Sequence, residues 1–237
     1  MNIAIIIAGG VGSRMHSEVP KQFIEVNGKP IIIYTLEAFE RHPEIDAIEV
    51  VCIEGWHTYL KQKAKEYGIT KLKWIINGGD SGQASARNGL FNLENILNSD
   101  DVVVIHDAIR PILPQIIISD MLRVCYEQGN ACASIPCHET LILTDNQISG
   151  RQSIERSTIR RVQTPQAYKY GEILSAHKQA LKMGITHSVY ANTLMVELGK
   201  TIYFSLGFDN NVKITTPEDI TLFKALLLMS EDELVKR

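Results

Sequence analysis

Short apolar segments alternate with helical patterns along the first half of this chain. Four segments rich in Ile or Val have the length of buried strands: Ile3 to Ala8, Ile48 to Ile53, Trp74 to Asn77 and Val102 to His106. Apolar residues recur near helical spacing after each of them, in Pro30 to Arg41, Trp56 to Tyr67, Gln83 to Ile96 and Pro114 to Gln128. This alternation predicts an α/β fold in which helices cover both faces of a mainly parallel sheet. Such sheets bind ligands beyond the carboxyl ends of their strands, so the loops at 9–21, 78–85 and 107–111 are expected to meet.

The alternation ends after Ala131, where turn-rich sequence predicts hairpins. Ala131 to Pro136, Thr140 to Thr144 and Thr158 to Gln163 have the composition of strands, separated by Asp, Asn, Ser and Gly. We expect one domain over residues 1–237 that carries an antiparallel β-hairpin arm at about 137–163. Because exposed ribbons are poorly stable alone, the arm is expected to pack on a second copy of the chain.

The core is expected to resume after the arm. Thr201 to Phe204 and Asn211 to Ile214 are predicted strands. Thr216 is the expected N-cap of a final helix, with Pro217 at its first position and Asp219 completing a capping box.

Composition limits the classes of partner. The chain has 237 residues, 45% of them hydrophobic, which is enough to form a full core. With 24 Lys and Arg against 27 Asp and Glu, the formal charge of -3 provides no general attraction to nucleic acid or an anionic membrane.

No apolar run approaches the ~20 residues that span a bilayer, and Met1-Asn2-Ile3 leads into a strand without a basic leader, which predicts a cytoplasmic protein. Four cysteines without a C-x-x-C pair argue against zinc, and Cys52 and Cys125 are expected to be small buried residues.

A glycine loop follows the first predicted strand. The glycines of Gly9-Gly10-Val11-Gly12 let backbone N–H groups approach anionic oxygens, and Arg14 and Lys21 supply positive charge. This pattern favours a phosphate-rich ligand, with a plain strand-to-loop turn as the alternative. Met15 stands where a dinucleotide fingerprint needs a small residue, and no Gly-Lys-Ser/Thr closes a P-loop, which argues against a dehydrogenase and an ordinary NTPase.

Several strand-end segments resemble one enzyme family. They are AGGVGSRM with PKQF, GGDSGQAS, HDAIRP, RVQTPQ and NVKITTPEDI, in this order and over nearly the whole chain. Together they resemble the cytidylyltransferases of methylerythritol phosphate and ribitol 5-phosphate. The resemblance implies a Rossmann-like fold of the nucleotidyltransferase type. It also implies a reaction in which a phosphate oxygen of a polyol phosphate attacks the α-phosphorus of CTP, giving a CDP-polyol and pyrophosphate.

The resemblance assigns catalytic and nucleotide-binding residues. Arg14 and Lys21 align with the family's transition-state stabilisers, and cations suit the charge that grows on the α-phosphate oxygens. Because a phosphate monoester is already largely dianionic at neutral pH, no general base is required. Mg²⁺ is expected to bridge CTP phosphate oxygens with few protein ligands. The residues that align with the CTP loops are Ile7, Ala8, Gly9, Gly10, Val11, Gly78, Gly79, Asp80 and Ser85.

The acceptor side is assigned in the same way. The aligned residues are Asp107, Arg110, Thr140, Arg156, Thr164 and Lys213. The family pattern implies that Arg110 and Thr140 reach a neighbouring subunit's site, which makes a homodimer functional. Asp107 is implied to contact substrate or Mg²⁺, whereas His106, which points to the other side of its strand, is expected to be structural.

Two assignments on the acceptor side have competitors. Arg160 and Arg161 compete with Arg156 for the acceptor's phosphate. Thr164 either contacts the acceptor or caps a turn.

The identity of the acceptor is left open by the sequence. Ala8-Gly9-Gly10 and Pro20-Lys21-Gln22-Phe23 favour ribitol 5-phosphate, with the methylerythritol phosphate of isoprenoid precursor synthesis as the alternative. His187 to Asn192 stands where a Thr-Asp-Asp run is common and fits neither branch, which leaves a related polyol or sugar phosphate of a cell-surface polymer open. Two other functions stay open as alternatives. One is a nucleotide-sugar pyrophosphorylase that uses UTP or GTP, and the other is a nucleotide sensor without turnover. The presence of both Arg14 and Lys21 argues against the sensor.

Overall fold

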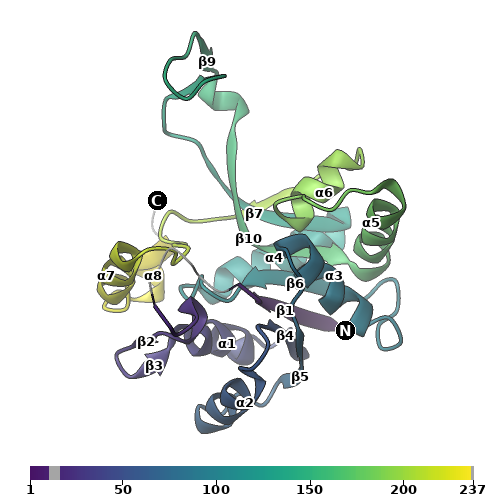
Figure 1. Cartoon of the computed structure of the whole chain (residues 1–237), viewed down its shortest axis with the longest axis vertical. Coiled ribbons are helices and arrows are strands. Elements are labelled where there is room, and N and C mark those ends of the chain that lie inside the picture. The colour runs from purple at the N-terminus through teal and green to yellow at the C-terminus, as the bar shows by residue number, and fades with distance from the viewer. Residues whose placement is uncertain (11–16, 236–237) are drawn as a thin grey trace.

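The computed structural model describes residues 1–10 and 17–235 and is built around a seven-stranded sheet (Figure 1). The strands of this sheet are β1 (Asn2–Ala8), β4 (Ala47–Cys52), β5 (Leu72–Asn77), β6 (Val102–Asp107), β7 (Asn130–Pro136), β10 (Arg160–Lys169) and β11 (Phe204–Leu206). They lie in the order β11-β7-β10-β6-β1-β4-β5. All of these strands run in one direction except β10, which is antiparallel to both neighbours. The mainly parallel sheet predicted from the sequence is confirmed.

Helices cover both faces of the sheet, as predicted. One core is formed with α1 (Ile31–Arg41), α2 (His57–Glu66), α4 (Gln115–Gln128), α7 (Pro217–Leu226) and α8 (Glu231–Val235). The other is formed with α3 (Gly82–Asn92), α5 (Tyr170–Met183) and α6 (Ala191–Glu197). Burial on both faces of the sheet explains the continuous apolar sequence of β1. Ala4 and Ile6 face the first core, and Ile3 and Ile5 face the second.

The predicted hairpins are divided between the sheet and a projecting arm. β8 (Leu141–Leu143) and β9 (Gln152–Ile154) pair with each other and extend away from the body of the molecule (Figure 1). The strand predicted at 158–163 instead starts β10, which continues to Lys169 between β6 and β7. The sequence did not indicate this continuation, because Pro165 has no N–H to donate to a neighbouring strand. In the structure the pairing register with β7 shifts between Val162 and Gln166.

Three strand predictions need correction. Trp74 to Asn77 lies in β5, which is the edge strand of the sheet and is half-buried rather than buried. The strand expected at 201–204 lies further along as β11. Asn211 to Ile214 forms no strand, because its backbone bonds to a loop: Ile214 N–H donates to the carbonyl of Ile109 at 2.9 Å. Apolar residues in a short segment indicate burial, and burial does not require sheet pairing.

Small elements connect these layers. They are η2 (Lys21–Phe23), the β2 (Glu25–Val26) and β3 (Lys29–Pro30) ladder, and η3 (Arg156–Thr158) on the arm. The predicted start of α7 is confirmed: Pro217 is its first residue, and the Asp219 carboxylate accepts from the Thr216 N–H at 2.8 Å.

All four cysteines are buried and unpaired, and burial raises the pKa of both Cys52 and Cys125 to about 12, which fits the expected packing role. None of the described helices has the length and apolar character needed to cross a bilayer.

One carboxyl group is buried in the core beneath α3. Glu49 of β4 is fully buried, and its Oε1 accepts from Asn92 Nδ2 at 2.6 Å, while Oε2 has no hydrogen-bond partner among the described residues. Gly89 leaves room for this group, because a Cβ there would lie 2.9 Å from Oε2. Burial raises the pKa of Glu49 to about 8, although the Asn92 hydrogen bond lowers it. At neutral pH α3 therefore packs against a mostly protonated, neutral acid.

We expect Glu49→Gln to flatten the dependence of stability on pH. In the parent protein the folded state keeps a proton that the unfolded chain has already lost, because the ordinary pKa is 4.5 and the folded one is about 8. The free energy of unfolding should therefore fall by up to about 1.4 kcal/mol per unit as pH rises from about 5 to 8. Urea unfolding at pH 6, 7 and 8 measures this slope.

The exposed Glu139 provides the control, since Glu139→Gln should keep the parent slope. An equal slope in the parent and in Glu49→Gln would show that the buried carboxyl group does not titrate in this range.

Candidate active site

A cavity of about 560 Å³ opens where the carboxyl ends of β1, β5 and β6 converge. Its lining consists of Ile7, Ala8, Gly9, Gly10, Lys21, Gln22, Gly79, Asp80, Ser81, Gly82, Ser85, Ala86, Ile105, His106, Asp107, Ala108, Ile109, Thr164, Gln166, Val189, Tyr190, Ala191 and Lys213. The predicted meeting of the strand-end loops is confirmed. Residues distant in sequence share the cavity because parallel strands end at the same edge of the sheet.

Two glycine loops pack directly against each other beside this cavity. A Cβ on Gly78 would lie 3.1 Å from the Cα of Gly9, and a Cβ on Gly9 would lie 3.1 Å from Ser85 Oγ. Ser85 is buried, and its Oγ accepts from the Gly79 N–H at 3.1 Å. Ser85 therefore holds the second loop in shape, so its hydroxyl is already bonded within the chain.

The N-terminus of α3 faces the same cavity. Ser81 is its N-cap, and the Ser81 hydroxyl accepts from the Ala84 N–H at 3.1 Å. Ser81 and Gly82 both line the cavity. Unpaired N–H groups and the helix dipole at such an end favour an anion.

Lys21 reaches the cavity from the short helix η2. Its neighbour Gln22 is buried, and Gln22 Nε2 donates to the carbonyl of Ala8 at 2.7 Å. This bond ties η2 to the end of β1 and brings Lys21 to the glycine loop. Two further predicted residues, Val11 and Arg14, lie outside the described residues.

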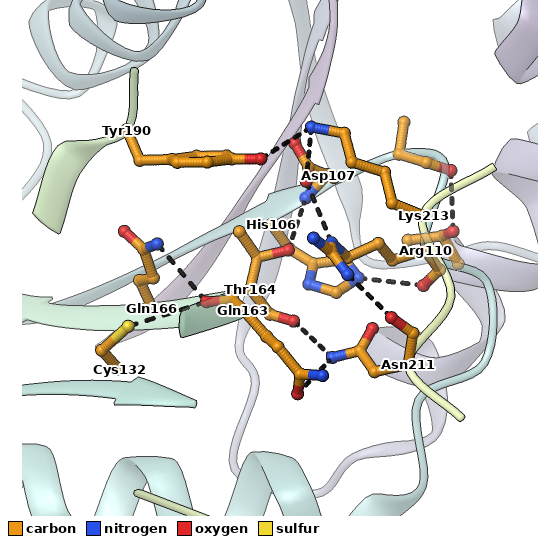
Figure 2. Close-up of polar contacts among 12 residues, drawn as sticks. His106, Asp107, Arg110, Cys132, Gln163, Thr164, Gln166, Tyr190, Asn211 and Lys213 are labelled. Carbon is orange, nitrogen blue, oxygen red and sulfur yellow. Dashed lines mark hydrogen bonds and ion pairs between the residues drawn. The ribbon is translucent and has the colours of Figure 1, made fainter. Parts of the chain in front are cut away.

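A charged cluster lies at the carboxyl end of β6, and its Asp107 and Lys213 line the cavity (Figure 2). Asp107 Oδ2 lies 3.1 Å from Arg110 Nε and 3.2 Å from Lys213 Nζ. Burial alone would raise the pKa of Asp107, but the positive charges of Lys213 and Arg110 lower it below its ordinary value. Burial would likewise lower the pKa of Lys213, but the Asp107 charge and a hydrogen bond to Tyr190 raise it. One carboxylate thus holds two cations, and the cluster keeps a net positive charge that suits an arriving anion.

The Gln-Thr-Pro-Gln segment of β10 positions this cluster. Asn211 Nδ2 donates to the carbonyl of Thr164 at 2.8 Å and to Gln163 Oε1 at 3.3 Å, which fixes the loop that carries Lys213. On the other side, Gln166 Oε1 accepts from the Asn192 N–H at 3.2 Å. Thr164 Oγ1 accepts from the Asp107 N–H at 3.2 Å (Figure 2). The buried glutamines therefore hold the loops on either side of the cavity, and the Thr164 hydroxyl holds the end of β6.

Tyr190 is the residue that the sequence prediction missed. Its hydroxyl lies 2.9 Å from Lys213 Nζ, and that nitrogen is 5.0 Å from the centre of its ring. The signal was present in the sequence, because the segment 187–192 departs from both branches of the family. No pattern in the segment indicated which side chain would turn toward the cavity.

The structure does not bring every predicted acceptor residue into the cavity. Arg110 is almost buried and bonds within its own chain, to Asp107 and, through Nη1, to the carbonyl of Asn211 at 2.7 Å. Thr140 and Arg156 belong to the arm, where Arg156 Nη1 donates to the carbonyl of His138 at 3.1 Å. Of the competitors for Arg156, Arg160 bonds to Ser134 within the sheet.

His106 has the structural role that its strand position predicted. The ring is fully buried, and Nε2 lies 3.0 Å from the carbonyl oxygen of Arg110. Burial lowers the pKa of His106 to about 4, against the raising effect of the Arg110 hydrogen bond. The neutral imidazole thus fixes the loop that follows Asp107.

Comparisons with known proteins identify the family of this chain. The family model described as IspD, 2-C-methyl-D-erythritol 4-phosphate cytidylyltransferase, matches residues 2–229. The ribitol-5-phosphate cytidylyltransferase of Lacticaseibacillus paracasei is 47% identical over 98% of this chain and 100% of its own. The 2-C-methyl-D-erythritol 4-phosphate cytidylyltransferase of Clostridium acetobutylicum is 37% identical over 96% of this chain and 97% of its own.

A solved structure is similar in fold. The 4-diphosphocytidyl-2C-methyl-D-erythritol synthase of Anaerococcus prevotii superimposes with a TM-score of 0.81 over 96% of both chains, at 23% sequence identity.

Gly79→Ala is expected to disrupt the second glycine loop. A Cβ at this position would lie 2.5 Å from Ala84 Cβ and 2.9 Å from the Ala84 carbonyl carbon, so the loop must move away from α3. We expect affinity for CTP to fall about tenfold or more, since a displaced loop can no longer place its backbone N–H groups against phosphate oxygens, and one such charge-assisted hydrogen bond contributes about 1.5–3 kcal/mol. Calorimetric titration with CTP measures the change.

Gly171→Ala is the matched control, because a Cβ on Gly171 would also be crowded, at 2.8 Å from Ser99 Cβ, but Gly171 does not line the cavity. It should keep the parent affinity, and both variants should melt cooperatively. Equal CTP affinity of Gly79→Ala and the parent would contradict the role given to this loop.

Proposed function

The chain belongs to the 2-C-methyl-D-erythritol 4-phosphate cytidylyltransferase (IspD) family and is a cytidylyltransferase, and we propose that its acceptor is ribitol 5-phosphate. The proposed reaction joins CMP from CTP to the acceptor's phosphate and releases pyrophosphate. The assignment of this acceptor rests on the 47% identity with a ribitol-5-phosphate cytidylyltransferase along nearly the whole chain. Identity with the methylerythritol phosphate enzyme is lower, at 37%, which makes that acceptor the less favoured alternative.

The chemistry requires positive charge more than it requires a base. The acceptor's phosphate is mostly dianionic at neutral pH and attacks without losing a proton to a side chain. Its approach to a triphosphate is opposed by repulsion, and charge then grows on the α-phosphate and on departing pyrophosphate. The two cationic ends of the cavity, Lys21 with the α3 N-terminus and Lys213 with Asp107, are suited to these two anions.

We assign the two ends of the cavity to the two substrates. CTP would lie along the glycine loops and the N-terminus of α3, where backbone N–H groups can bind phosphate oxygens. The acceptor's phosphate would bind Lys213, which Asp107 orients. Arg110 is almost buried, and its role would be to hold the Asp107 carboxylate in place.

Mg²⁺ is proposed as a nucleotide-bound cofactor. Within the described part of the chain no group of three His, Cys, Asp or Glu side chains forms a metal site, and Asp80 and Asp107 are the acidic residues of the cavity. This donor set fits a Mg²⁺ held mainly by phosphate oxygens and water, with Asp107 as the candidate protein ligand. When bound, the ion would neutralise phosphate charge.

A homodimer remains part of the proposal. The β8–β9 hairpin projects from the body, and its Ile142, Leu143 and Ile148 are exposed by 59%, 50% and 91%. An isolated two-stranded hairpin with such side chains gains stability when a second surface covers them. A second copy of the chain is the proposed cover.

The activity test is a matrix of substrates. Purified protein is incubated with CTP, UTP or GTP and with ribitol 5-phosphate or 2-C-methyl-D-erythritol 4-phosphate, in the presence of Mg²⁺, and pyrophosphate is measured. We expect the highest kcat/KM with CTP and ribitol 5-phosphate. A higher value with methylerythritol phosphate would overturn the acceptor assignment, and release with UTP but not CTP would overturn the nucleotide assignment.

Lys21→Ala should lower kcat far more than it weakens CTP binding. Charge on the α-phosphate oxygens grows mainly in the transition state, so a cation placed there contributes little to ground-state affinity. We expect kcat to fall about 100-fold or more, as when one donor to a developing oxyanion is removed, with the CTP dissociation constant changed much less. Steady-state kinetics and a CTP titration separate the two quantities, and near-normal turnover would contradict the role.

A further inference from the structure

Tyr190 lies at the cavity without a role in the assignments above. It is the residue before α6, and it lines the cavity together with Val189 and Ala191. Its backbone is anchored locally, since its N–H donates to Thr193 Oγ1 at 2.9 Å and its carbonyl accepts from the Leu194 N–H at 3.1 Å. These bonds fix the backbone of Tyr190 at the start of the helix.

The segment around Tyr190 is also tied to both halves of the site. The Ser188 N–H donates to Gln83 Oε1 of α3 at 2.9 Å, on the nucleotide side. The Asn192 N–H donates to Gln166 Oε1 of β10 at 3.2 Å, on the acceptor side. Gln83, Gln166 and Asn192 are all buried, so the phenol is carried by a fixed segment and not by a mobile loop.

Lys213 has the opposite character. It lies in an irregular segment rather than in a helix or strand, and its long side chain has many rotamers to lose. Two neighbours restrict it among the described residues: Asp107 Oδ2 at 3.2 Å and the Tyr190 hydroxyl at 2.9 Å (Figure 2). The ring adds a cation–π contact, with Nζ 5.0 Å from its centre.

The chemistry of the phenol matters as much as its position. Arg110, Lys213 and Asp107 together carry one net positive charge, and a neutral hydroxyl holds the ammonium without cancelling it. A carboxylate in the same place would hold Lys213 equally well but would leave the cluster neutral and unattractive to an anion. A hydroxyl can also turn its hydrogen toward an arriving phosphate oxygen.

We propose that Tyr190 is a positioning residue for the acceptor, which holds the Lys213 ammonium against Asp107 so that it meets the acceptor's phosphate in the cavity. The proposal rests on the proposed function, because it takes the phosphorylated polyol as the ligand of Lys213. It goes beyond it by naming the group that fixes the acceptor-binding cation.

The first test concerns Lys213 itself and needs no substrate. Protein with ¹³C- and ¹⁵N-labelled lysine is studied by NMR relaxation at neutral pH, and the Lys213 side-chain resonance is assigned by its absence in Lys213→Arg. Because the Tyr190 hydroxyl and Asp107 together hold the ammonium, Tyr190→Phe should lower the order parameter of the Lys213 side chain. An order parameter that matches the parent would overturn the proposed contact.

The second test concerns the acceptor. In Tyr190→Phe we expect the KM for ribitol 5-phosphate to rise about tenfold, which is the loss of one hydrogen bond to a charged group. The KM for CTP and kcat should each change less than about twofold, because the phenol acts on the other end of the cavity. An equal rise in both KM values, a change in kcat alone, or no change would each overturn the positioning role.

Tyr67→Phe is the matched control. The Tyr67 hydroxyl also bonds within the chain, to the carbonyl of Gly28 at 3.0 Å, and Lys29 Nζ lies 5.2 Å from its ring, but Tyr67 does not line the cavity. It should keep the parent order parameter of Lys213 and both KM values. Failure of the parent to use ribitol 5-phosphate would overturn the acceptor assignment alone. The KM comparison would then use methylerythritol phosphate, and the order parameter of Lys213 does not depend on either substrate.

Discussion

The shared ion pairing of Asp107 is the interaction on which the site depends. Two cations placed this close would repel each other, and two long side chains would extend into solvent, if no carboxylate lay between them. Asp107 can hold both because it is the last residue of β6, where its backbone is fixed by the sheet and by Thr164. Its single charge binds the two cations without neutralising them, so the cavity keeps a local attraction for anions in a chain whose formal charge is -3.

Buried amides connect this cluster to the fold. Gln163 and Asn211 fix the loop that carries Lys213, and Gln166 fixes the start of α6 with Tyr190. Such groups are costly to bury unless they are hydrogen-bonded, so each amide specifies one arrangement of the loops that it bridges. Because both glutamines lie on β10, the antiparallel strand aligns the two walls of the acceptor end at once.

The nucleotide end is organised by close backbone packing. Gly9 and Gly78 pack so closely that a Cβ on either would press against the other's Cα, at 3.1–3.3 Å, and Ser85 bonds the second loop back to α3. The same helix packs on the protonated Glu49 through Asn92 and Gly89. The position of the α3 N-terminus, where an anion is expected, therefore depends on a neutral acid in the core beneath it.

Periodicity in the sequence determined the central strands, the helices that follow them and both covered faces, because alternating buried positions are a local property of the chain. Lys21, Asp107 and Lys213 were named from motifs that resemble one family, and the structure places all three in the lining of one cavity. Tertiary structure decided the rest. β10 crosses Pro165 to enter the middle of the sheet, Asn211 to Ile214 is buried without pairing, and Tyr190 turns toward Lys213 across 23 residues. Those outcomes depend on which partner each backbone group and side chain finds in space, and no local pattern encodes that choice.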